Sequence, residues 1–400
     1  MTETASTRSG SRGAAGLLVV AIDRLPAWIV PAYGAAWVAM PRLTALAARG
    51  VVLDRVIVTT DEPRDALGDL LGGAGEVPPV MAAAAARGWK TALVTDDAAV
   101  DVTGAEVTCV PAAPRAVPER EVESTCLARL GAAADAAVAA GDQRLVVMHV
   151  TSLGTCWDAP AEFREAYVDP DDPPPPAGAH VPDFDVAAGA DPDLLVGIRH
   201  AFAGQLTLLD GCLGGVIDAA VVKNWDVVVV GLRGLALGLH GRVGIGGTAP
   251  LGELVHVPAV VCAGGRMAGQ RYGGIVVPAD VGATLVELLD GPPGPTESAA
   301  PWRGTSLTRL LESWSAPPRD RAVTTTRGGA AIVTPAWHCA AAAGRVTLFA
   351  KPDDYFELCD VADRCPELAE ELGRLATAAA SGDAAAAWRA ALSAAALSPV

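Results

Sequence analysis

The chain has 400 residues, of which 51% are hydrophobic and 4% aromatic, so it can bury a sizeable core built mainly from Ala, Val and Leu. It carries 30 Lys and Arg against 46 Asp and Glu, a formal net charge of −16. So acidic a chain repels nucleic-acid phosphates and anionic membranes, although a locally basic site can still hold a small anion. The run Leu17–Ile22 is too short for a signal peptide or a membrane span. We therefore expect a cytoplasmic protein that binds neither nucleic acid nor membranes.

Short apolar runs alternate with helical patterns through most of the chain, after a polar stretch at residues 1–15 that we expect to be disordered. The runs are Val-rich and continuous, as is typical of parallel strands covered on both faces. This alternation predicts a doubly wound α/β domain over residues 16–315. The predicted strands are 17–22, 90–95, 144–150, 225–232 and 256–264, and the predicted helices are 40–50, 80–88, 124–141 and 199–220.

Two segments interrupt the alternation. Residues 169–192 are rich in Pro and Asp and predict an extended surface insertion, and residues 290–304 close the α/β region. Residues 320–400 predict a small C-terminal α+β lobe, with apolar runs at AAIVTP, RVTLFA and YFELCDV followed by an acidic helix, CPELAEELGRLATAAA.

The stretch LLVVAIDRLPAWIVPAYG (17–34) delivers a single carboxylate, Asp23, to the end of an apolar strand. The pattern alone leaves two interpretations open, a metal ligand or a turn former. The eight cysteines are scattered and none stands in a CxxC pair, so neither a zinc knuckle nor a disulfide framework is indicated, and buried thiols are expected.

The order of several segments resembles the sulfatase branch of the alkaline phosphatase superfamily. IDRLPAWIVPAYG and MPRLTALAARGVVLDRV resemble the opening strand, turn and helix of that family, and RGWKTALVTDD resembles its second strand. CWDAP, FAGQLTLLDGCLGGVID, GLALGLHG and GELVHVPAVV resemble later segments, and LFAKPDDYFELCDVADRCPEL resembles the C-terminal lobe. The resemblance covers nearly the whole chain in the right order and implies a sheet sandwiched by helices plus a small C-terminal lobe.

The resemblance also implies a site for hydrolysis of sulfate or phosphate esters. Active members of the family hold a divalent cation, usually calcium, on carboxylate or amide side chains at strand ends. Their nucleophile is a formylglycine made from a cysteine, or a Ser or Thr in phosphatase relatives. Asp23 occupies a metal-ligand position of the family, and His240 in GLALGLHG occupies a position of its proton-transfer residues.

This chain departs from that pattern at most of the other positions. Its nucleophile segment reads IVTTDEPRDAL, has no cysteine, and places Asp61 or Thr60 at the nucleophile position, with Arg64 standing for the motif arginine. Arg24 and Arg233 occupy positions where the family has metal-binding acids or amides, and Gly154 replaces a histidine.

Three functional hypotheses remain open at this stage. The first is a pseudoenzyme without a cofactor, in which Asp23 pairs with Arg24 or Arg233 in place of a metal. In it, Arg24, Arg64 and Arg233 form a cradle for an anionic ligand or a protein partner. The second is an active sulfate- or phosphate-ester hydrolase with an atypical Thr60 or Asp61 nucleophile, and the third is a structural subunit of a larger assembly.

Overall fold

The structure is a computed structural model that describes residues 14–73, 76–112, 121–246, 249–263, 269–290, 304–308 and 319–398. Residues 1–13 of the predicted tail, and most of 290–304 together with the boundary at 315, lie outside the described residues. Ala15, within the predicted tail, is already bound to the fold, because its backbone N–H donates to Asn224 O at 3.2 Å.

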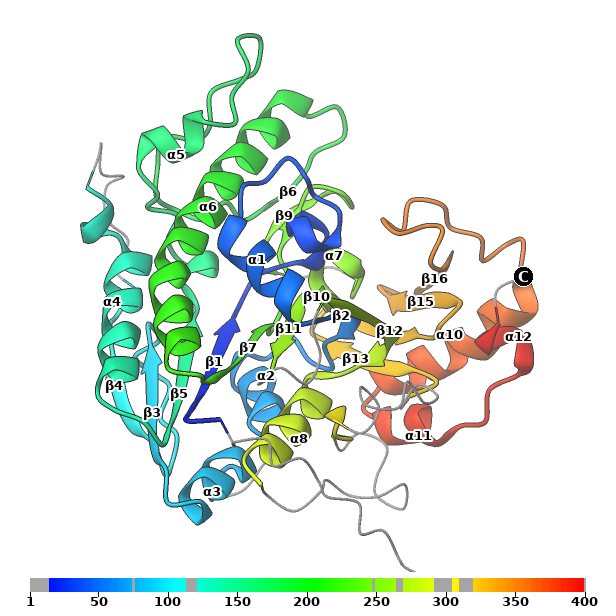
Figure 1. The fold of residues 1–400 in the computed structure, drawn as a ribbon. Helices are drawn as coiled ribbons and strands as arrows, with labels where there is room; N and C mark the ends of the chain where they lie inside the picture. Colours follow the sequence, from blue (N-terminus) through cyan, green and yellow to red (C-terminus); the bar gives the residue numbers. More distant parts are fainter. Residues whose placement is uncertain are drawn as a thin grey trace, which may run out of the picture.

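The main sheet runs in the order β10-β2-β11-β7-β1-β5-β3-β4, with β12 paired to β2 (Figure 1). Its strands are β1 (Leu17–Ile22), β2 (Val51–Ile57), β3 (Lys90–Thr95), β4 (Glu106–Cys109), β5 (Arg144–Val150), β7 (Asp226–Gly231), β10 (His256–Val257), β11 (Ala259–Cys262) and β12 (Gln270–Val276). The central strand β1 pairs in parallel with β5 and β7. The predicted strand 256–264 is broken at Pro258 and runs antiparallel to β2 and β7, so the prediction of a parallel strand there was wrong.

Helices cover both faces of this sheet (Figure 1). The α-helices of the main domain are α1 (Pro41–Arg49), α2 (Pro63–Leu70), α3 (Pro79–Ala86), α4 (Cys126–Ala139), α5 (Ala161–Glu165), α6 (Pro192–Val222), α7 (Gly252–Val255) and α8 (Pro278–Leu288), of which α5 packs on α6. Alternate residues of β1 enter opposite cores, as a strand period of two requires. Leu18 and Val20 pack in the core beside α1, α4 and α6, while Leu17 and Val19 pack in the core beside α2, α3 and α8.

Among the described residues one helix, α6, is long and apolar enough to cross a membrane by length and composition. Its most apolar window is 56% buried inside the protein, and the helix packs against α4 and α5. The core helix of a protein can have the same length and composition, so this observation is only weak evidence for a membrane span.

The predicted C-terminal lobe is a four-stranded antiparallel sheet covered by a helix. Its elements are β13 (Ala322–Thr326), β14 (Gly329–Val333), β15 (Trp337–Ala342), β16 (Arg345–Ala350), α10 (Pro366–Ala380), α11 (Ala384–Arg389) and α12 (Ala394–Leu397). The segment YFELCDV (355–361) forms turns and no strand, so that part of the prediction was wrong. Asp354 comes directly before this segment and Asp360 is its last but one residue. Their carboxylates accept backbone N–H groups of the segment and of Ala362, and so stabilise the turns.

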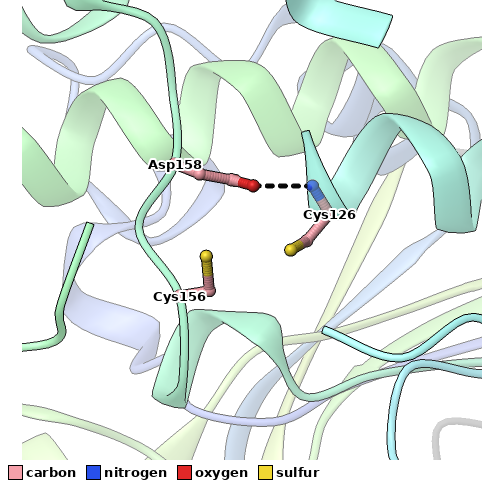
Figure 2. A group of neighbouring side chains, drawn as sticks. All are labelled: Cys126, Cys156 and Asp158. Carbon is pink, nitrogen blue, oxygen red and sulfur yellow. Dashed lines mark hydrogen bonds between the residues drawn. The ribbon is translucent and has the colours of Figure 1, made fainter. Parts of the chain in front are cut away.

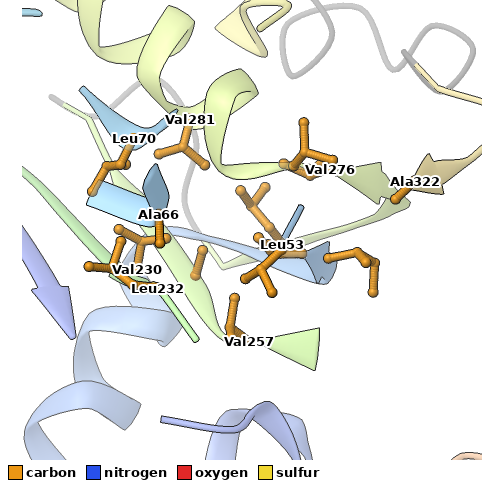
Figure 3. Packing of buried hydrophobic residues seen from close by; sticks show 14 of the residues in the cluster. Leu53, Ala66, Leu70, Val230, Leu232, Val257, Val276, Val281 and Ala322 are labelled. Atoms are coloured by element: carbon orange, nitrogen blue, oxygen red, sulfur yellow. The ribbon is translucent and has the colours of Figure 1, made fainter. Parts of the chain in front are cut away.

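The lobe shares a core with the main sheet. Figure 3 shows Ala322 of β13 in the same hydrophobic cluster as Leu53 of β2 and Val276 of β12. Thr325 N–H donates to Thr59 O at 2.9 Å, which joins β13 directly to the segment that follows β2. The lobe therefore fixes one side of the sheet edge at which the candidate site lies.

The Pro- and Asp-rich insertion is attached to the body at its far end. Phe184–Asp185 (β6) pairs with β9 (Arg242–Gly244), which in turn pairs with β8 (Ala236–Leu237). Buried Arg164 of α5 donates to Gly178 O at 3.1 Å and also to Pro176 O at 2.7 Å. The insertion is thus tied to the body of the protein through β9 and α5.

Candidate functional site

Polar side chains meet where the parallel strands end. Asp23 follows β1, Asp96 follows β3, Thr151 follows β5, and Arg233 lies two residues after β7. Because the carboxyl ends of parallel strands lie at one edge of a sheet, the fold brings these residues together at the position where α/β proteins bind ligands.

Asp23 and Arg233 form a buried, bidentate ion pair. Arg233 Nε donates to Asp23 Oδ1 at 2.7 Å and Arg233 Nη2 donates to Asp23 Oδ2 at 2.5 Å. The two residues are 5% and 6% exposed, and Arg233 Nη1 donates to the backbone oxygen of Asp61. The predicted pairing of Asp23 with an arginine is confirmed, and its fork-to-carboxylate geometry is the strongest arrangement such a pair adopts.

Arg24 is a second buried guanidinium at the same carboxylate. Its Nε lies 3.7 Å from Asp23 Oδ2 and its Nη1 donates to Gly234 O at 3.3 Å. Burial lowers the pKa of Arg24, and Asp23 acts in the opposite direction. A Cβ at Gly154 would stand 2.8 Å from Arg24 Cγ, so the glycine at this position makes room for the Arg24 side chain.

The segment after β2 contributes a carboxylate and a hydroxyl. Asp61 lines the cavity described below, and its Oδ2 accepts the backbone N–H of Arg327 at 3.0 Å. Thr60 pairs with Thr325 in a β-bridge, and its Oγ1 accepts Glu62 N–H at 3.1 Å. The hydroxyl of Thr60 therefore acts as an acceptor in a local turn.

Arg64 and His240, two further predicted site residues, lie outside the cavity lining. Arg64 is exposed on α2. His240 Nε2 lies 3.9 Å from Glu357 Oε2 of the C-terminal lobe, and burial lowers the pKa of His240. The predicted cradle thus retains Arg24 and Arg233, while the structure does not bring Arg64 or His240 to them.

A cavity of about 510 Å³ opens at this edge of the sheet. Its charged lining consists of three arginines and four aspartates: Arg24, Arg233, Arg327, Asp23, Asp61, Asp96 and Asp97. Backbone and small side chains from Thr151, Gly154 and Thr155 complete one wall.

Sequence reasoning missed Arg327 and Asp96. Arg327 comes from the turn between β13 and β14 and forms a bidentate pair with Glu62 at 2.7 and 3.0 Å. Its position depends on how the lobe packs, so no local signal reveals it. Asp96 follows β3 directly, a strand-end position that could have identified it. Its carboxylate accepts Thr151 N–H, Thr151 Oγ1–H and Ser152 N–H at 2.6–2.9 Å, and so joins the ends of β3 and β5.

The fold and this strand-end site define the class of protein to which the chain is similar. No family model matches the sequence, and no curated protein matches it. Solved structures do match, including the phosphonate monoester hydrolases of Agrobacterium radiobacter and Silicibacter pomeroyi. Their TM-scores are 0.68 and 0.70, at 18% and 17% identity, over 90% of this chain and 94% and 93% of those chains.

A 2-O GAG sulfatase matches with a TM-score of 0.68 at 14% identity, over 92% of this chain and 93% of that one. At these identities the likeness establishes the fold alone. The expected sulfatase-like α/β fold with a small C-terminal lobe is thus confirmed.

Proposed function

We propose that this chain is a sulfatase-fold pseudoenzyme that lacks metal-dependent ester hydrolysis and binds a small oxyanion, such as sulfate or phosphate, at the strand-end cavity. One observation carries the proposal. Guanidinium nitrogens of Arg233 and Arg24 lie 2.5 to 3.7 Å from the carboxylate oxygens of Asp23, at the position where active members of the resembled family hold a metal.

The residues present do not fit calcium. Calcium takes six to eight oxygen ligands, several of them anionic. Both oxygens of Asp23 accept hydrogen bonds from Arg233, and both oxygens of Asp96 accept them from Thr151 and Ser152. A divalent cation beside Asp23 would also stand next to Arg24 and Arg233, and like charges within about 5 Å repel by several kcal/mol even at an effective dielectric constant of 20.

The segment that supplies a nucleophile in active relatives is also held in other contacts. The Thr60 hydroxyl accepts Glu62 N–H, and one Asp61 oxygen accepts Arg327 N–H. No histidine is among the described residues that line the cavity. An imidazole therefore cannot act there as the general base for Thr60 or Asp61.

Arg24 supports the oxyanion half of the proposal. The side chain lines the cavity, is 7% exposed, and has a pKa lowered chiefly by burial. The carboxylate that acts most strongly on it, Asp23, is already bidentate to Arg233, while Asp61 and Asp183 contribute less. An oxyanion in the cavity would therefore compensate a desolvated charge that Asp23 compensates only in part.

The experiment combines binding and turnover. Calorimetric titration with inorganic sulfate and phosphate should give binding that Arg24→Gln weakens by about tenfold or more, because a charge-assisted hydrogen bond is lost. Arg64→Gln serves as the control, since Arg64 is exposed outside the cavity, and it should bind like the unsubstituted chain. Nitrophenyl sulfate and nitrophenyl phosphate should not be turned over with added Ca²⁺, Mg²⁺ or Mn²⁺.

Two results would overturn the two halves of the proposal separately. Metal-dependent turnover that is lost in Asp23→Ala would show an active hydrolase and end the pseudoenzyme half. Anion binding that is absent, or equal in Arg24→Gln and the unsubstituted chain, would end the oxyanion half.

A further inference from the structure

A buried cluster of two thiols and a carboxylate lies apart from the residues that line the strand-end cavity (Figure 2). Cys126 is the first residue of α4, and Cys156 and Asp158 lie on the segment between β5 and α5. The Sγ atoms and a carboxylate oxygen all lie within 4.8 Å of one another. Their residues are 1%, 0% and 1% exposed, so residues 30 and 32 positions apart in the chain converge on a site closed to bulk solvent.

Asp158 carries an unsatisfied oxygen in this cluster. Its Oδ2 accepts the backbone N–H of Cys126 at 2.8 Å, and Figure 2 shows this bond. Its Oδ1 is buried and has no hydrogen-bond partner. Buried carboxylate oxygens are almost always paired, so an unpaired oxygen on a side chain of this cluster favours a bound ligand there.

The surroundings favour negative charge at the cluster. Arg129 Nη2 donates to Cys126 Sγ at 3.8 Å. Arg164 Nη2 donates to the backbone oxygen of Trp157, the residue between Cys156 and Asp158. Two arginines thus bring positive charge to the two thiols and the carboxylate.

We propose that Cys126, Cys156 and Asp158 bind a divalent transition-metal ion of the zinc type. Thiolate sulfur together with a carboxylate oxygen is a donor set that suits Zn²⁺, whereas Ca²⁺ and Mg²⁺ require oxygen ligands throughout. Three protein ligands leave one position of a tetrahedral site for water.

The metal would act by positioning. It joins the start of α4 to the segment 151–160, in which Gly154 and Thr155 line the strand-end cavity. Ala112, which lines the same cavity, also packs against Cys126 and Cys156. A bound ion would therefore hold the part of the cavity wall that Ala112, Gly154 and Thr155 form, whatever that cavity binds.

Cobalt provides the direct test, because Co²⁺ bound to thiolate gives an intense charge-transfer absorption that oxygen ligands do not. Titration of the metal-free full chain with Co²⁺ should produce this band with one equivalent, and Zn²⁺ should displace it. Cys156→Ser and Asp158→Asn should each weaken binding by more than about tenfold, since even indirect support of a metal ligand contributes that much. Cys212→Ser is the control, because this half-buried cysteine of α6 lies outside the cluster, and it should leave the titration unchanged.

The measurement on the unsubstituted chain decides the matter even where a variant fails to fold. Absence of a thiolate band at stoichiometric Co²⁺ would overturn the proposal, as would a band that survives in folded Cys156→Ser. Mass spectrometry that finds a Cys126–Cys156 disulfide in protein purified without reductant would also overturn it, since oxidised sulfur no longer supplies thiolate ligands.

Discussion

The contact between Asp23 and Arg233 places two charges in largely buried positions at the wall of the cavity. Removing Arg233 leaves the Asp23 charge buried with only Arg24, at 3.7 Å, to compensate it in part, which costs more than the pair itself contributes. We therefore expect Arg233→Ala to lower the free energy of unfolding by about 3–5 kcal/mol, as measured by urea denaturation. The double variant Asp23→Asn/Arg233→Met should recover a large part of this loss, because it removes both charges together.

An exposed pair in the same chain supplies the contrast. Arg345 Nη2 lies 2.8 Å from Asp360 Oδ2, with the arginine side chain 74% exposed. Arg345→Ala should change the free energy of unfolding by less than about 1 kcal/mol, because solvent screens such a pair. Equal losses for Arg233→Ala and Arg345→Ala would mean that the Asp23 carboxylate is solvated in the protein.

At the scale of elements, helix α6 carries two glycines with opposite surroundings. A Cβ at Gly204 would stand 2.7 Å from Phe163 O and 2.8 Å from Arg164 Cα, so α5 crosses α6 at backbone distance there. Gly211, two turns further along, has open space around its Cα. Gly204→Ala should destabilise the protein by about 1–3 kcal/mol through overpacking, whereas Gly211→Ala should stabilise it by up to about 1 kcal/mol through helix propensity. Thermal unfolding of the two variants measures both effects, and a shift of the same sign in both would contradict the predicted close contact.

The elements that sequence reasoning placed well share a physical cause. Leu17–Ile22, Arg144–Val150 and the last four residues of Lys90–Thr95 are buried on both faces, so their composition alone marks them as strands. β2 (Val51–Ile57) and β12 (Gln270–Val276) escaped notice, because both interrupt apolar residues with arginine and β12 adds two glycines. Whether the run at 256–264 is parallel depends on its partners β2 and β7, which the local sequence does not encode.

The residues of the candidate site that follow predicted strands could be predicted from the sequence, and those that tertiary contacts bring together could not. Asp23, Arg24 and Arg233 sit next to strands whose ends the pattern fixes, and these residues converge. Arg327 and the thiol cluster of Cys126 and Cys156 arise from contacts between segments far apart in the chain. A search for closely spaced cysteines, such as a CxxC pair, does not find these two thiols, because they are 30 positions apart in the sequence.

At the scale of the whole molecule, Glu357 joins the C-terminal lobe to the main domain. Its Oε2 accepts Gly252 N–H at 3.0 Å, and its Oε1 lies 3.3 Å from His338 Nδ1 and in contact with Lys351 Nζ. The first of these partners belongs to the main domain and the other two belong to the lobe. Because the residue is 4% exposed, the junction depends on the carboxylate being ionised.

Acid should therefore weaken the junction between the lobe and the main domain. Burial on its own raises the pKa of Glu357, but the hydrogen bonds and charges of His338 and Lys351 outweigh it and lower the pKa from 4.5 to about 2. A lowered pKa in the folded state contributes stability that is present above about pH 4.5 and is lost as the pH falls towards 2, by up to roughly 3 kcal/mol.

Urea denaturation between pH 5 and about pH 2 should show this loss in the unsubstituted chain and a markedly shallower one in Glu357→Gln. Glu370→Gln, which removes an exposed carboxylate of α10, is the matched control and should keep the full slope. A Glu357→Gln variant that loses as much stability in acid as the unsubstituted chain would show that this carboxylate does not hold the two parts of the molecule together.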